Sequence, residues 1–455
     1  MNIRRVLVAN RGEIAARIIR TCRNLGIETA LAASEADLDA VPARLADHIV
    51  CIGPAHASQS YLNVDAVVRA AAAAKADAVH PGYGFLAENV RLARACREHG
   101  IVFIGPTEAQ LEAVGDKMQA RAHAVAAGLP VVPGGPVGSP AEAAALAKVI
   151  GVPLLVKAVA GGGGRGMKLV TDAARTAETA DLAMAEAGAA FADPRVYLER
   201  FVIAGRHVEV QIVGDGGDVV HLGDRDCSVQ RRHQKLVEEA PAPGLPETTR
   251  AAMHEAAIAF GRHLGYRGLG TVEFLLDRDC GVFYFLEMNA RIQVEHPVTE
   301  AITGLDLVAE QIAIAEGRPL RLRQQDIRFH GHAIECRLNA ENWTHDFRPS
   351  PGTVTTAVFP AGAGIRVDTH IEGGARVPPF YDSLLAKIVA HGANRGSAIE
   401  RMKSALASCR VDGVATNRDM HLFLLALPEF LRGGMDTPFF ARALQRREGD
   451  GGRPS

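Results

Sequence analysis

The stretch of sequence that decides the fold is Glu287-Met288-Asn289-Ala290-Arg291-Ile292-Gln293-Val294-Glu295. Along it, acidic, amide and guanidinium side chains occupy every second position, and mostly apolar side chains fall between them. In an extended chain, residues of one parity point to the same side. We therefore expect one strip of backbone to direct a row of polar groups toward a common site: Glu287, Asn289, Arg291, Gln293 and Glu295.

The segment before this row predicts a β-hairpin. Residues 270–276 and 282–287 are rich in strand-forming residues, and the polar segment between them favours a turn. A hairpin centred on Cys280 places Glu273 opposite Glu287. Like charges directly opposite one another destabilise a sheet, so this pair suggests a hard divalent cation, which prefers oxygen ligands. We expect a metal–nucleotide site that continues into an anion site with its own base.

The composition limits the class of protein. The chain has 455 residues, enough for about two to four domains. It is 48% hydrophobic and 22% charged, with net charge −2, as is typical of a soluble globular protein. Lys and Arg are scattered and only 5% of residues are aromatic, which argues against a nucleic-acid partner.

Targeting and redox signals are equally plain. The apolar run at 6–9 is too short for a signal peptide. Charged residues interrupt the Ala-rich stretch 66–79, so we expect no membrane span. The seven cysteines form no C-x-x-C pair, which favours a reduced, cytoplasmic protein without a zinc knuckle or disulfide framework.

Residues 1–104 alternate short apolar strands with helices, which predicts a parallel sheet covered on both faces. Strands are expected at 6–9, 27–33, 49–52, 78–80 and 101–104, and helices at 12–25, 64–74 and 89–99. Ligands bind beyond the carboxyl ends of such strands. The loop His80-Pro81-Gly82-Tyr83-Gly84-Phe85 is therefore a candidate wall of the site, although a turn that only reverses the chain explains it about equally well.

Two lysines and a glycine-rich stretch are notable between residues 105 and 202. Lys117 lies in a predicted helical connector, where a lysine is more often a solvated charge. Lys157 lies inside an apolar strand, where a charge needs a partner or a ligand. Residues 161–166 are followed by a strand and by no Lys-Ser/Thr pair, which argues against a dinucleotide-binding turn and a Walker loop. Two interpretations remain: a flap whose backbone N–H groups surround phosphate oxygens, and a flexible loop without a ligand. We favour the flap.

The remaining segments predict further strands and helices. Alternation at 207–212 is typical of a half-buried strand. The polar segment 224–235 fits either a solvated loop or a polyanion-binding segment. We expect helices at 305–316 and 396–408 and a strand at 332–338. The polar tail from Arg446 is expected to be disordered.

An ATP-dependent ligase explains these features together, because ATP phosphates need lysines and N–H groups, Mg²⁺ needs oxygen ligands, and an acceptor anion needs a cation and a base. Over about residues 2–445 the chain resembles the biotin carboxylase family of the ATP-grasp superfamily. The segments that carry the resemblance are 8–15 (VANRGEIA), 80–85 (HPGYGF), 161–167 (GGGGRGM), 231–235 (RRHQK), 238–243 (EEAPAP) and 287–297 (EMNARIQVEHP).

The resemblance implies a multidomain fold of mixed α/β and α+β class. It predicts a Rossmann-like N-terminal domain (1–104), a helical connector (105–131), an ATP-grasp lid with the glycine-rich flap (132–202), an ATP-grasp catalytic domain (203–334), a C-terminal mixed α/β domain (335–446) and a disordered tail (447–455). ATP would lie between the lid and the catalytic domain.

The implied reaction converts ATP, bicarbonate and carrier-linked biotin into ADP, phosphate and carboxybiotin through carboxyphosphate. It is the first half-reaction of acetyl-CoA or acyl-CoA carboxylase, and so of fatty acid biosynthesis. The implied cofactors are ATP, Mg²⁺ or Mn²⁺ (two ions) and biotin. The implied partners are a biotin carboxyl carrier protein or biotinyl domain, carboxyltransferase subunits and a second copy of the chain, with no nucleic acid or membrane. The final acceptor belongs to the carboxyltransferase, and the chain shows no biotinyl domain of its own.

The resemblance also implies a role for each matching residue. The catalytic residues would be Glu295 as the base for bicarbonate, Arg337 as the stabiliser of the biotin enolate, Arg291 and Lys235. The bicarbonate site would comprise Lys235, Arg291, Gln293, the backbone of Val294 and Glu295, and the biotin site Tyr83 and Arg337. The metal ligands would be Glu273, Glu287 and Asn289. The ATP-binding residues would be Lys117, Lys157, Gly162, Gly163, Gly164, Met167, Glu199, His207, Gln230 and His233.

Three departures from the family pattern bear on nucleotide binding and on the subgroup. Arg200 stands where the family often has Lys beside the hinge glutamate, which affects base selectivity. The segments 343–345 and 437–439 differ from the bacterial stand-alone enzyme and favour relatives of the acyl-CoA carboxylase α type.

Two other functions account for part of the pattern. Another ATP-grasp carboxylate–amine ligase would share the lysines and metal acids, but it would not need the row formed by Arg291, Gln293 and Glu295. A non-catalytic nucleotide-binding subunit would not need every charged catalytic position to be filled.

Overall fold

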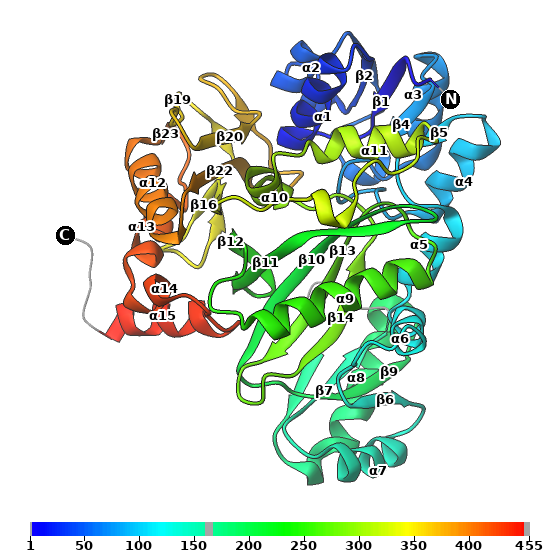
Figure 1. Cartoon of the computed structure of the whole chain (residues 1–455), viewed down its shortest axis with the longest axis vertical. Coiled ribbons are helices and arrows are strands. Elements are labelled where there is room, and N and C mark those ends of the chain that lie inside the picture. Colours follow the sequence, from blue (N-terminus) through cyan, green and yellow to red (C-terminus); the bar gives the residue numbers. More distant parts are fainter. Residues whose placement is uncertain (1, 160–166, 450–455) are drawn as a thin grey trace.

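A computed structural model describes residues 2–159 and 167–449. The predicted flap contacts Gly162, Gly163 and Gly164 lie outside these residues. The multidomain fold of mixed α/β and α+β class is confirmed (Figure 1).

The N-terminal region forms the expected parallel sheet, with strand order β3-β2-β1-β4-β5. Alternate residues of β1 face opposite layers: Val6 and Val8 pack against α1 and α11, and Leu7 packs against α3 and α4. The sheet is therefore covered on both faces, as predicted. The elements are β1 (Arg5–Val8), α1 (Gly12–Asn24), β2 (Glu28–Ala33), α2 (Val41–Leu45), β3 (His48–Cys51), α3 (Val64–Ala73), β4 (Ala78–His80), α4 (Val90–Glu98) and β5 (Val102–Phe103).

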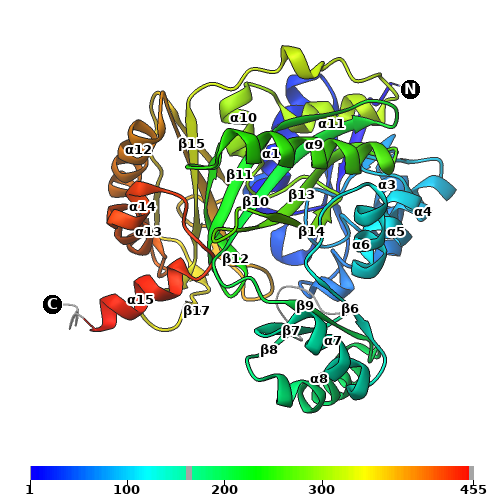
Figure 2. The same ribbon diagram turned by 60° about the horizontal axis from the view of Figure 1, so that its bottom comes forward.

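A pair of helices leads from this sheet into a small domain that projects from the rest of the molecule (Figure 2). The helices are α5 (Glu108–Gly115) and α6 (Lys117–Ala126). The projecting domain, which we call the lid, has an antiparallel sheet of order β6-β9-β7-β8. Its elements are β6 (Gly134–Val137), α7 (Pro140–Ile150), β7 (Leu154–Ala158), β8 (Met167–Val170), α8 (Thr176–Phe191) and β9 (Val196–Arg200).

One face of the lid sheet is apolar, and the other carries the charges. Val156 and Leu198 pack into the lid core formed with α7 and α8. Because side chains alternate along a strand, Lys157 and Glu199 point away from these helices. The odd charge inside the predicted apolar strand thus lies on the face that is free of the lid helices.

The largest element is an eight-stranded antiparallel sheet of order β14-β13-β10-β11-β12-β15-β22-β20. The predicted boundary at 334/335 falls inside β15, so the predicted catalytic and C-terminal domains share this sheet. The strands are β10 (Gly205–Asp215), β11 (Val219–Arg231), β12 (Gln234–Ala240), β13 (Arg267–Asp277), β14 (Phe283–Asn289), β15 (His332–Asn339), β20 (Ile365–Thr369) and β22 (Leu384–Gly392).

Most of the polar segment 224–235 belongs to this sheet, so a solvated loop is wrong for residues 224–230, whereas Arg232 and His233 form an exposed turn between β11 and β12. Residues 224–231 continue β11, and Asp224 through Gln230 are buried. Their charges are satisfied by partners on neighbouring strands, for example Arg225 by Glu209 across the β10–β11 ladder. A sequence-local view could not anticipate these partners.

Helices pack on the large sheet, and small strands complete the C-terminal region. The helices are α9 (Glu247–His263), α10 (His296–Thr303), α11 (Leu307–Ala315), α12 (Arg395–Ser408), α13 (Arg418–Ala426), α14 (Pro428–Arg432) and α15 (Phe439–Gly449). The small strands are β16 (Glu341–Asn342), β17 (Arg348–Pro349), β18 (Gly352–Thr353), β19 (Thr356–Val358), β21 (Arg376–Val377) and β23 (Arg410–Asp412).

Helix α15 continues through Gly449, so residues 447–449, expected in a disordered tail, are helical. Residues 450–455 lie outside the described part. Within residues 2–159 and 167–449, no helix has both the length and the apolar character needed to cross a bilayer.

Candidate active site

The opening hairpin has the predicted register. Glu273 on β13 lies opposite Glu287 on β14, and Thr271 lies opposite Asn289. On its other side, Glu273 lies opposite Glu209 of β10. Three adjacent strands therefore place carboxylates side by side, which requires compensating positive charge in the same region.

The expectation that the strip stays extended to Glu295 is wrong. Strand β14 ends at Asn289, and α10 begins at His296, immediately after Glu295. The chain turns because Ala290 N–H donates to Glu88 Oε1 (2.9 Å) and the Lys387 ammonium donates to the Val294 carbonyl (2.9 Å). We call residues 290–295 the anion loop.

The row of polar side chains nevertheless converges, through the folded loop. Arg291 donates to Asn289 Oδ1 (2.7 Å) and to Gln293 Oε1 (2.8 Å). The amide groups of Asn289 and Gln293 in turn donate to Glu273 Oε1 at 2.9 and 3.2 Å. Arg291 is also paired with Glu88 at 2.8 Å. The hydrogen-bond chain orients Arg291 and Gln293 toward the hairpin.

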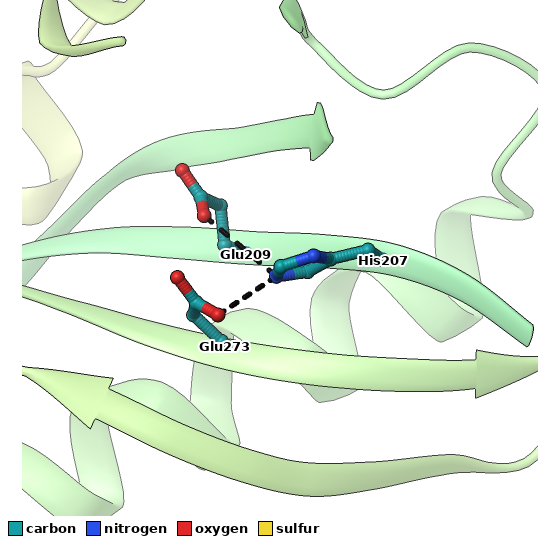
Figure 3. Close-up of side chains that lie close together, drawn as sticks. All are labelled: His207, Glu209 and Glu273. Carbon is teal, nitrogen blue, oxygen red and sulfur yellow. Dashed lines mark ion pairs between the residues drawn. The ribbon is translucent and has the colours of Figure 1, made fainter. Parts of the chain in front are cut away.

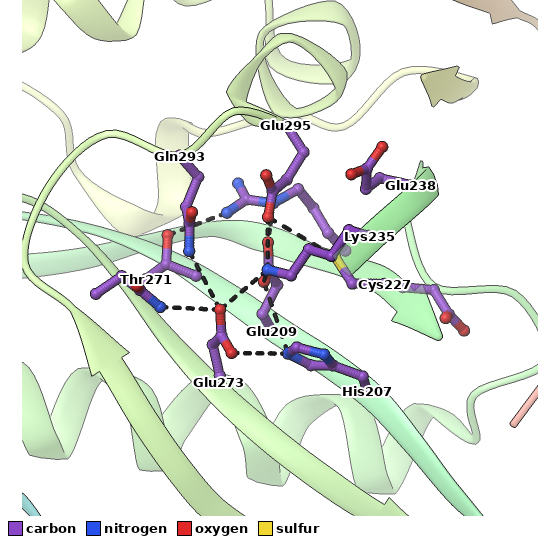
Figure 4. Close-up of polar contacts among 12 residues, drawn as sticks. His207, Glu209, Cys227, Lys235, Glu238, Thr271, Glu273, Gln293 and Glu295 are labelled. Atoms are coloured by element: carbon purple, nitrogen blue, oxygen red, sulfur yellow. Dashed lines mark hydrogen bonds and ion pairs between the residues drawn. The ribbon is translucent and has the colours of Figure 1, made fainter. Parts of the chain in front are cut away.

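Lys235 is the centre of the site (Figure 4). Its ammonium lies 2.6 Å from Glu209, 3.0 Å from Glu273 and 2.6 Å from Glu295. Burial opposes its charge, but the surrounding anions outweigh this and raise the pKa of Lys235 well above its ordinary value. Lys235 is therefore a fixed cation.

Glu295 is fully buried and held between two cations. Oε1 faces Lys235, and Oε2 accepts a hydrogen bond of 2.9 Å from Arg337 Nη2. Burial alone would raise the pKa of Glu295, but Lys235, Arg337 and Arg225 outweigh it and hold the pKa well below its ordinary value. The carboxylate is thus ionised and able to accept a proton.

Arg337 joins Glu295 to a second buried acid. Its Nε donates to Glu238 Oε1 at 2.6 Å, so the guanidinium fork bridges two carboxylates. Burial raises the pKa of Glu238 to about 7, with Arg337 acting against the rise and Glu295 adding to it. Glu238 therefore changes its protonation state around neutral pH.

The donor set around the hairpin fits a divalent cation. Burial and the neighbouring charge of Glu273 raise the pKa of Glu287, although Lys117, His207 and Lys235 act in the opposite direction. Two groups of potential ligands also cluster within 4.8 Å of one another: His207 with Glu209 and Glu273, and Glu209 with Cys227 and Glu295. Lys235 is ion-paired with the acids of both clusters, and a divalent cation would favour the ionised form of Glu287.

His207 lies beside two buried carboxylates, one of which is the predicted metal ligand Glu273 (Figure 3). Its Nε2 lies 2.9 Å from Glu273 and 4.0 Å from Glu209. Burial opposes a charged ring, but Glu273 raises the pKa of His207. The ion pair with Glu273 therefore favours the charged form of the ring.

A cleft of about 500 Å³ runs over these groups. Of the predicted residues it is lined by Tyr83, His207, His233, Lys235, Glu273, Glu287, Asn289, Arg291, Gln293, Val294 and Arg337. Glu295 lies beneath this surface, in contact with Lys235 and Arg337.

Three of the predicted nucleotide residues lie in the connector, the lid and the turn between β11 and β12: Lys117, Lys157 and His233. Burial and Lys157 lower the pKa of Lys117, whereas Glu287 and Glu199 act in the opposite direction. Burial, Lys157 and His207 lower the pKa of His233. Such electrostatic coupling requires proximity, so Lys117, Lys157 and His233 face one region. Lys157 is ion-paired with Glu199.

Two predicted nucleotide residues are less clearly placed. The amide of Gln230 is buried and donates to the Cys227 carbonyl at 3.4 Å. Met167 opens β8 opposite Lys157 and is half-buried. Arg200, the departure beside Glu199, is held by the Tyr284 hydroxyl at 2.7 Å and lies 3.8 Å from Asp277.

Four residues of the site were missed by sequence reasoning: Glu88, Glu209, Glu238 and Lys387. Glu209 had a signal, because it alternates with apolar residues beside His207 in a strand. Glu88 and Lys387 contact the anion loop from distant parts of the chain. Only the tertiary structure reveals these two contacts.

Comparisons with known families cover nearly the whole chain. Residues 2–111 match "Biotin carboxylase, N-terminal domain", residues 116–323 match "Carbamoyl-phosphate synthase L chain, ATP binding domain" and residues 335–442 match "Biotin carboxylase C-terminal domain".

Individual relatives agree with these matches. A biotin carboxylase from a Nostoc species is 49% identical over 442 residues, which cover 96% of this chain and 99% of the relative. The structure of a Campylobacter jejuni biotin carboxylase in complex with β,γ-ATP has a TM-score of 0.93 and 44% identity, covering 97% and 99% of the two chains.

A second similar structure is the biotin carboxylase domain dimer of Hydrogenobacter thermophilus 2-oxoglutarate carboxylase in complex with MgADP, ADP and bicarbonate. It has a TM-score of 0.93 and 42% identity and covers 100% of both chains. Because all these similarities extend along nearly the full length, with the matched regions in the same order, the chain belongs to the biotin carboxylase family.

Proposed function

We propose that this protein carboxylates biotin on a carrier protein, using ATP and bicarbonate through a carboxyphosphate intermediate. The observation that carries the proposal is the position of Glu295, an ionised carboxylate that ends the anion loop and is held between Lys235 and Arg337. Bicarbonate is a poor nucleophile, and a base within hydrogen-bond reach removes its proton as it attacks.

The first step joins bicarbonate to the γ-phosphoryl group. Glu295 takes the proton of bicarbonate, and an oxygen of bicarbonate forms a bond to the γ-phosphorus of ATP. The bond between this phosphorus and the oxygen of the departing ADP breaks. Arg291 and Lys235 would hold the anion, with Gln293 and the backbone of Val294 completing its site. Fixed cations in a buried site stabilise the developing charge more strongly than water does.

The second step transfers CO₂ to biotin. Carboxyphosphate splits into CO₂ and phosphate, and the phosphate takes the N–H proton of the ureido ring. The ring nitrogen then bonds to CO₂. Arg337, with Tyr83 at the biotin site, would stabilise the enolate oxygen, because a guanidinium offers paired donors in a fixed geometry.

ATP would lie between the lid and the large sheet. Lys117 and Lys157 would contact its phosphates, and Glu199, His207, Gln230, His233 and Met167 the nucleoside, with the glycine-rich flap at 161–166 as cover. Glu273, Glu287 and Asn289 would hold Mg²⁺ or Mn²⁺, which supplies positive charge to the phosphates. Closure of a lid would keep water from the carboxyphosphate.

The reaction requires partners. A biotin carboxyl carrier protein or biotinyl domain would bring biotin to the cleft, and carboxyltransferase subunits would use the product, as in an acetyl-CoA or acyl-CoA carboxylase. A homodimer is proposed because a close structural relative is a dimer. The seven cysteines of this chain are free, which favours a location in the reducing cytoplasm.

The test is ATP cleavage measured with and without bicarbonate and free biotin. Wild type should require bicarbonate and should form carboxybiotin. Glu295→Gln should retain ATP binding and lose about 99% or more of bicarbonate-dependent turnover, since it removes the base. ATP cleavage that responds to an amine but to neither bicarbonate nor biotin would assign the protein to the carboxylate–amine ligases.

Glu335→Gln is a matched control. Burial raises the pKa of Glu335 well above its ordinary value, whereas the pKa of Glu295 is lowered, so an amide changes the charge less at Glu335 than at Glu295. It is buried in the same sheet as Arg337. Turnover should therefore survive Glu335→Gln, and equal losses in both variants would remove the specific role of Glu295.

A further inference from the structure

A buried lysine behind the cleft contacts the anion loop. Lys387 lies on β22 and is fully enclosed. Its ammonium donates to the Val294 carbonyl at 2.9 Å and lies 3.0 Å from Glu13 Oε2 and 3.9 Å from Asp368. The contact at Val294 fixes the peptide that joins this residue to Glu295.

The same lysine is linked to the opposite wall of the cleft through Glu13. Glu13 lies in the first turn of α1, is 2% exposed and uses its other oxygen to accept a hydrogen bond from the Tyr83 hydroxyl. Tyr83 lines the cleft from the loop that follows β4. Asn10, just before α1, holds this loop by donating to the carbonyls of Pro81 and Tyr83, both at 2.7 Å.

We propose that Lys387 and Glu13 are positioning residues that set the distance between the anion loop and Tyr83. This proposal rests on the proposed function, in which the loop binds bicarbonate and Tyr83 contacts biotin. The two ions come from α1 of the N-terminal sheet and β22 of the large sheet. The ion pair therefore connects the anion loop, where bicarbonate would bind, with the loop that carries Tyr83, where biotin would bind.

The chemistry of a buried ion pair supports this role. Removing charged groups from water is costly, and an apolar pair of similar volume is often at least as stabilising. Beyond the pair, Glu13 accepts a hydrogen bond from the Tyr83 hydroxyl, and Lys387 donates one to the Val294 carbonyl and lies 3.9 Å from Asp368. The two hydrogen bonds end at different sides of the cleft. A pair that served stability alone would not need these two contacts.

The two substrate walls must be held closely for transfer to occur. CO₂ released at the anion loop has to meet the ureido nitrogen of biotin, and a displacement of about 1 Å can reduce a rate about 100-fold. ATP binds to a separate set of residues. Loss of the ion pair should therefore change the KM values for bicarbonate and biotin much more than the KM for ATP.

The experiment compares steady-state kinetics of Lys387→Met with wild type, using free biotin as acceptor. We expect the KM values for bicarbonate and for biotin to rise about tenfold or more, while the KM for ATP stays within about twofold. Equal increases for all three substrates, or no increase, would overturn the proposal.

A second variant guards against misfolding. Lys387→Met leaves Glu13 buried without its cation, whereas the double variant Glu13→Gln/Lys387→Met removes both charges and should fold. It should show the same selective increase in the two KM values. Normal kinetics in a folded double variant would contradict the positioning role.

Arg395→Met is a control for the loss of an ion-paired cation elsewhere on the large sheet; the Arg395 side chain is partly buried. Arg395 pairs with Glu239 of β12 at 2.7 Å. It also donates to the carbonyls of Phe430 and Leu431 in α14. Arg395→Met should not change the ratio of the KM for bicarbonate to the KM for ATP. The same selective shift in Arg395→Met would show that Lys387 acts only through general stability.

Tyr83→Phe tests the path through Glu13. If Lys387 acts on biotin through Glu13 and the Tyr83 hydroxyl, Tyr83→Phe added to Lys387→Met should raise the KM for biotin little further. If the increases in the KM for biotin from the two single variants multiply in the double variant, Lys387 does not act on biotin through Tyr83. Wild-type protein without bicarbonate-dependent ATP cleavage would contradict the proposed function itself, whereas an active wild type with a normal Lys387→Met contradicts only the positioning proposal.

Discussion

Each oxygen of Glu295 faces a different cation, Lys235 on one side and Arg337 on the other. This arrangement keeps the base ionised at the expense of its basicity, because both cations lower its pKa. Bicarbonate bound beside it would need the same cations. The site thus couples activation of the base to arrival of the anion.

Arg337 should not be replaceable by lysine. Its Nε and Nη2 reach Glu238 and Glu295 at the same time, and one ammonium cannot reproduce this fork. Arg337→Lys should reduce biotin carboxylation about 100-fold while the Kd for ATP changes less than about twofold. Carboxylation rates and calorimetric ATP titration measure the two effects, and equal losses in both would count against an enolate role.

Glu238 should make stability depend on pH. Its pKa is about 7 in the folded protein and 4.5 as a free side chain, so between these values the folded state binds a proton that the unfolded state has released. This contribution to stability therefore falls as the pH rises through the window. The variant Glu238→Gln lacks this titrating carboxyl. The free energy of unfolding of the variant, relative to that of wild type, should therefore increase from pH 5 to pH 8.

The size of the effect is on the order of 3 kcal/mol at most, the equivalent of the pKa difference. Urea unfolding of both proteins at pH 5 and pH 8 gives the comparison. A difference in unfolding free energy that is the same at the two pH values would show that Glu238 does not titrate in this range.

At the scale of elements, the start of α6 positions a predicted phosphate contact. Asp116 caps this helix, accepting from the N–H groups of Met118 (2.8 Å) and Gln119 (3.0 Å), and Lys117 is the first helical residue. Asp116→Ala should destabilise the protein by about 1 kcal/mol and raise the KM for ATP. Asp116→Asn keeps the acceptor and should restore most of both.

Thermal unfolding and steady-state kinetics with ATP measure this effect. If the alanine variant loses stability but keeps the wild-type KM for ATP, the first turn of α6 does not position Lys117 for the nucleotide.

The strands and helices of the N-terminal sheet could be predicted from their sequence, because their apolar periodicity reflects burial on both faces. The facing pair Glu273 and Glu287 could also be predicted from the local hairpin pattern. The path of the anion loop could not, since Glu88 and Lys387 turn it from remote positions. Parity arguments hold only while a strand continues, and β14 ends at Asn289.

At the scale of the whole molecule, the eight-stranded sheet makes the predicted catalytic and C-terminal domains one body. It brings Arg337 of β15 next to Lys235 of β12 and the acids of β10 and β13. Most of the predicted residues that line the cleft were assigned a role through the family resemblance. The charge balance between them depends on strand order, which no single motif contains.

The central claim is that bicarbonate attacks the γ-phosphate of ATP directly, and transfer of oxygen measures it. The reaction is run with ¹⁸O-labelled bicarbonate, ATP, Mg²⁺ and biotin, and the phosphate is analysed by mass spectrometry before the label exchanges with water. Carboxyphosphate chemistry places one oxygen of bicarbonate in each phosphate released. Phosphate that carries no oxygen from bicarbonate would contradict the account.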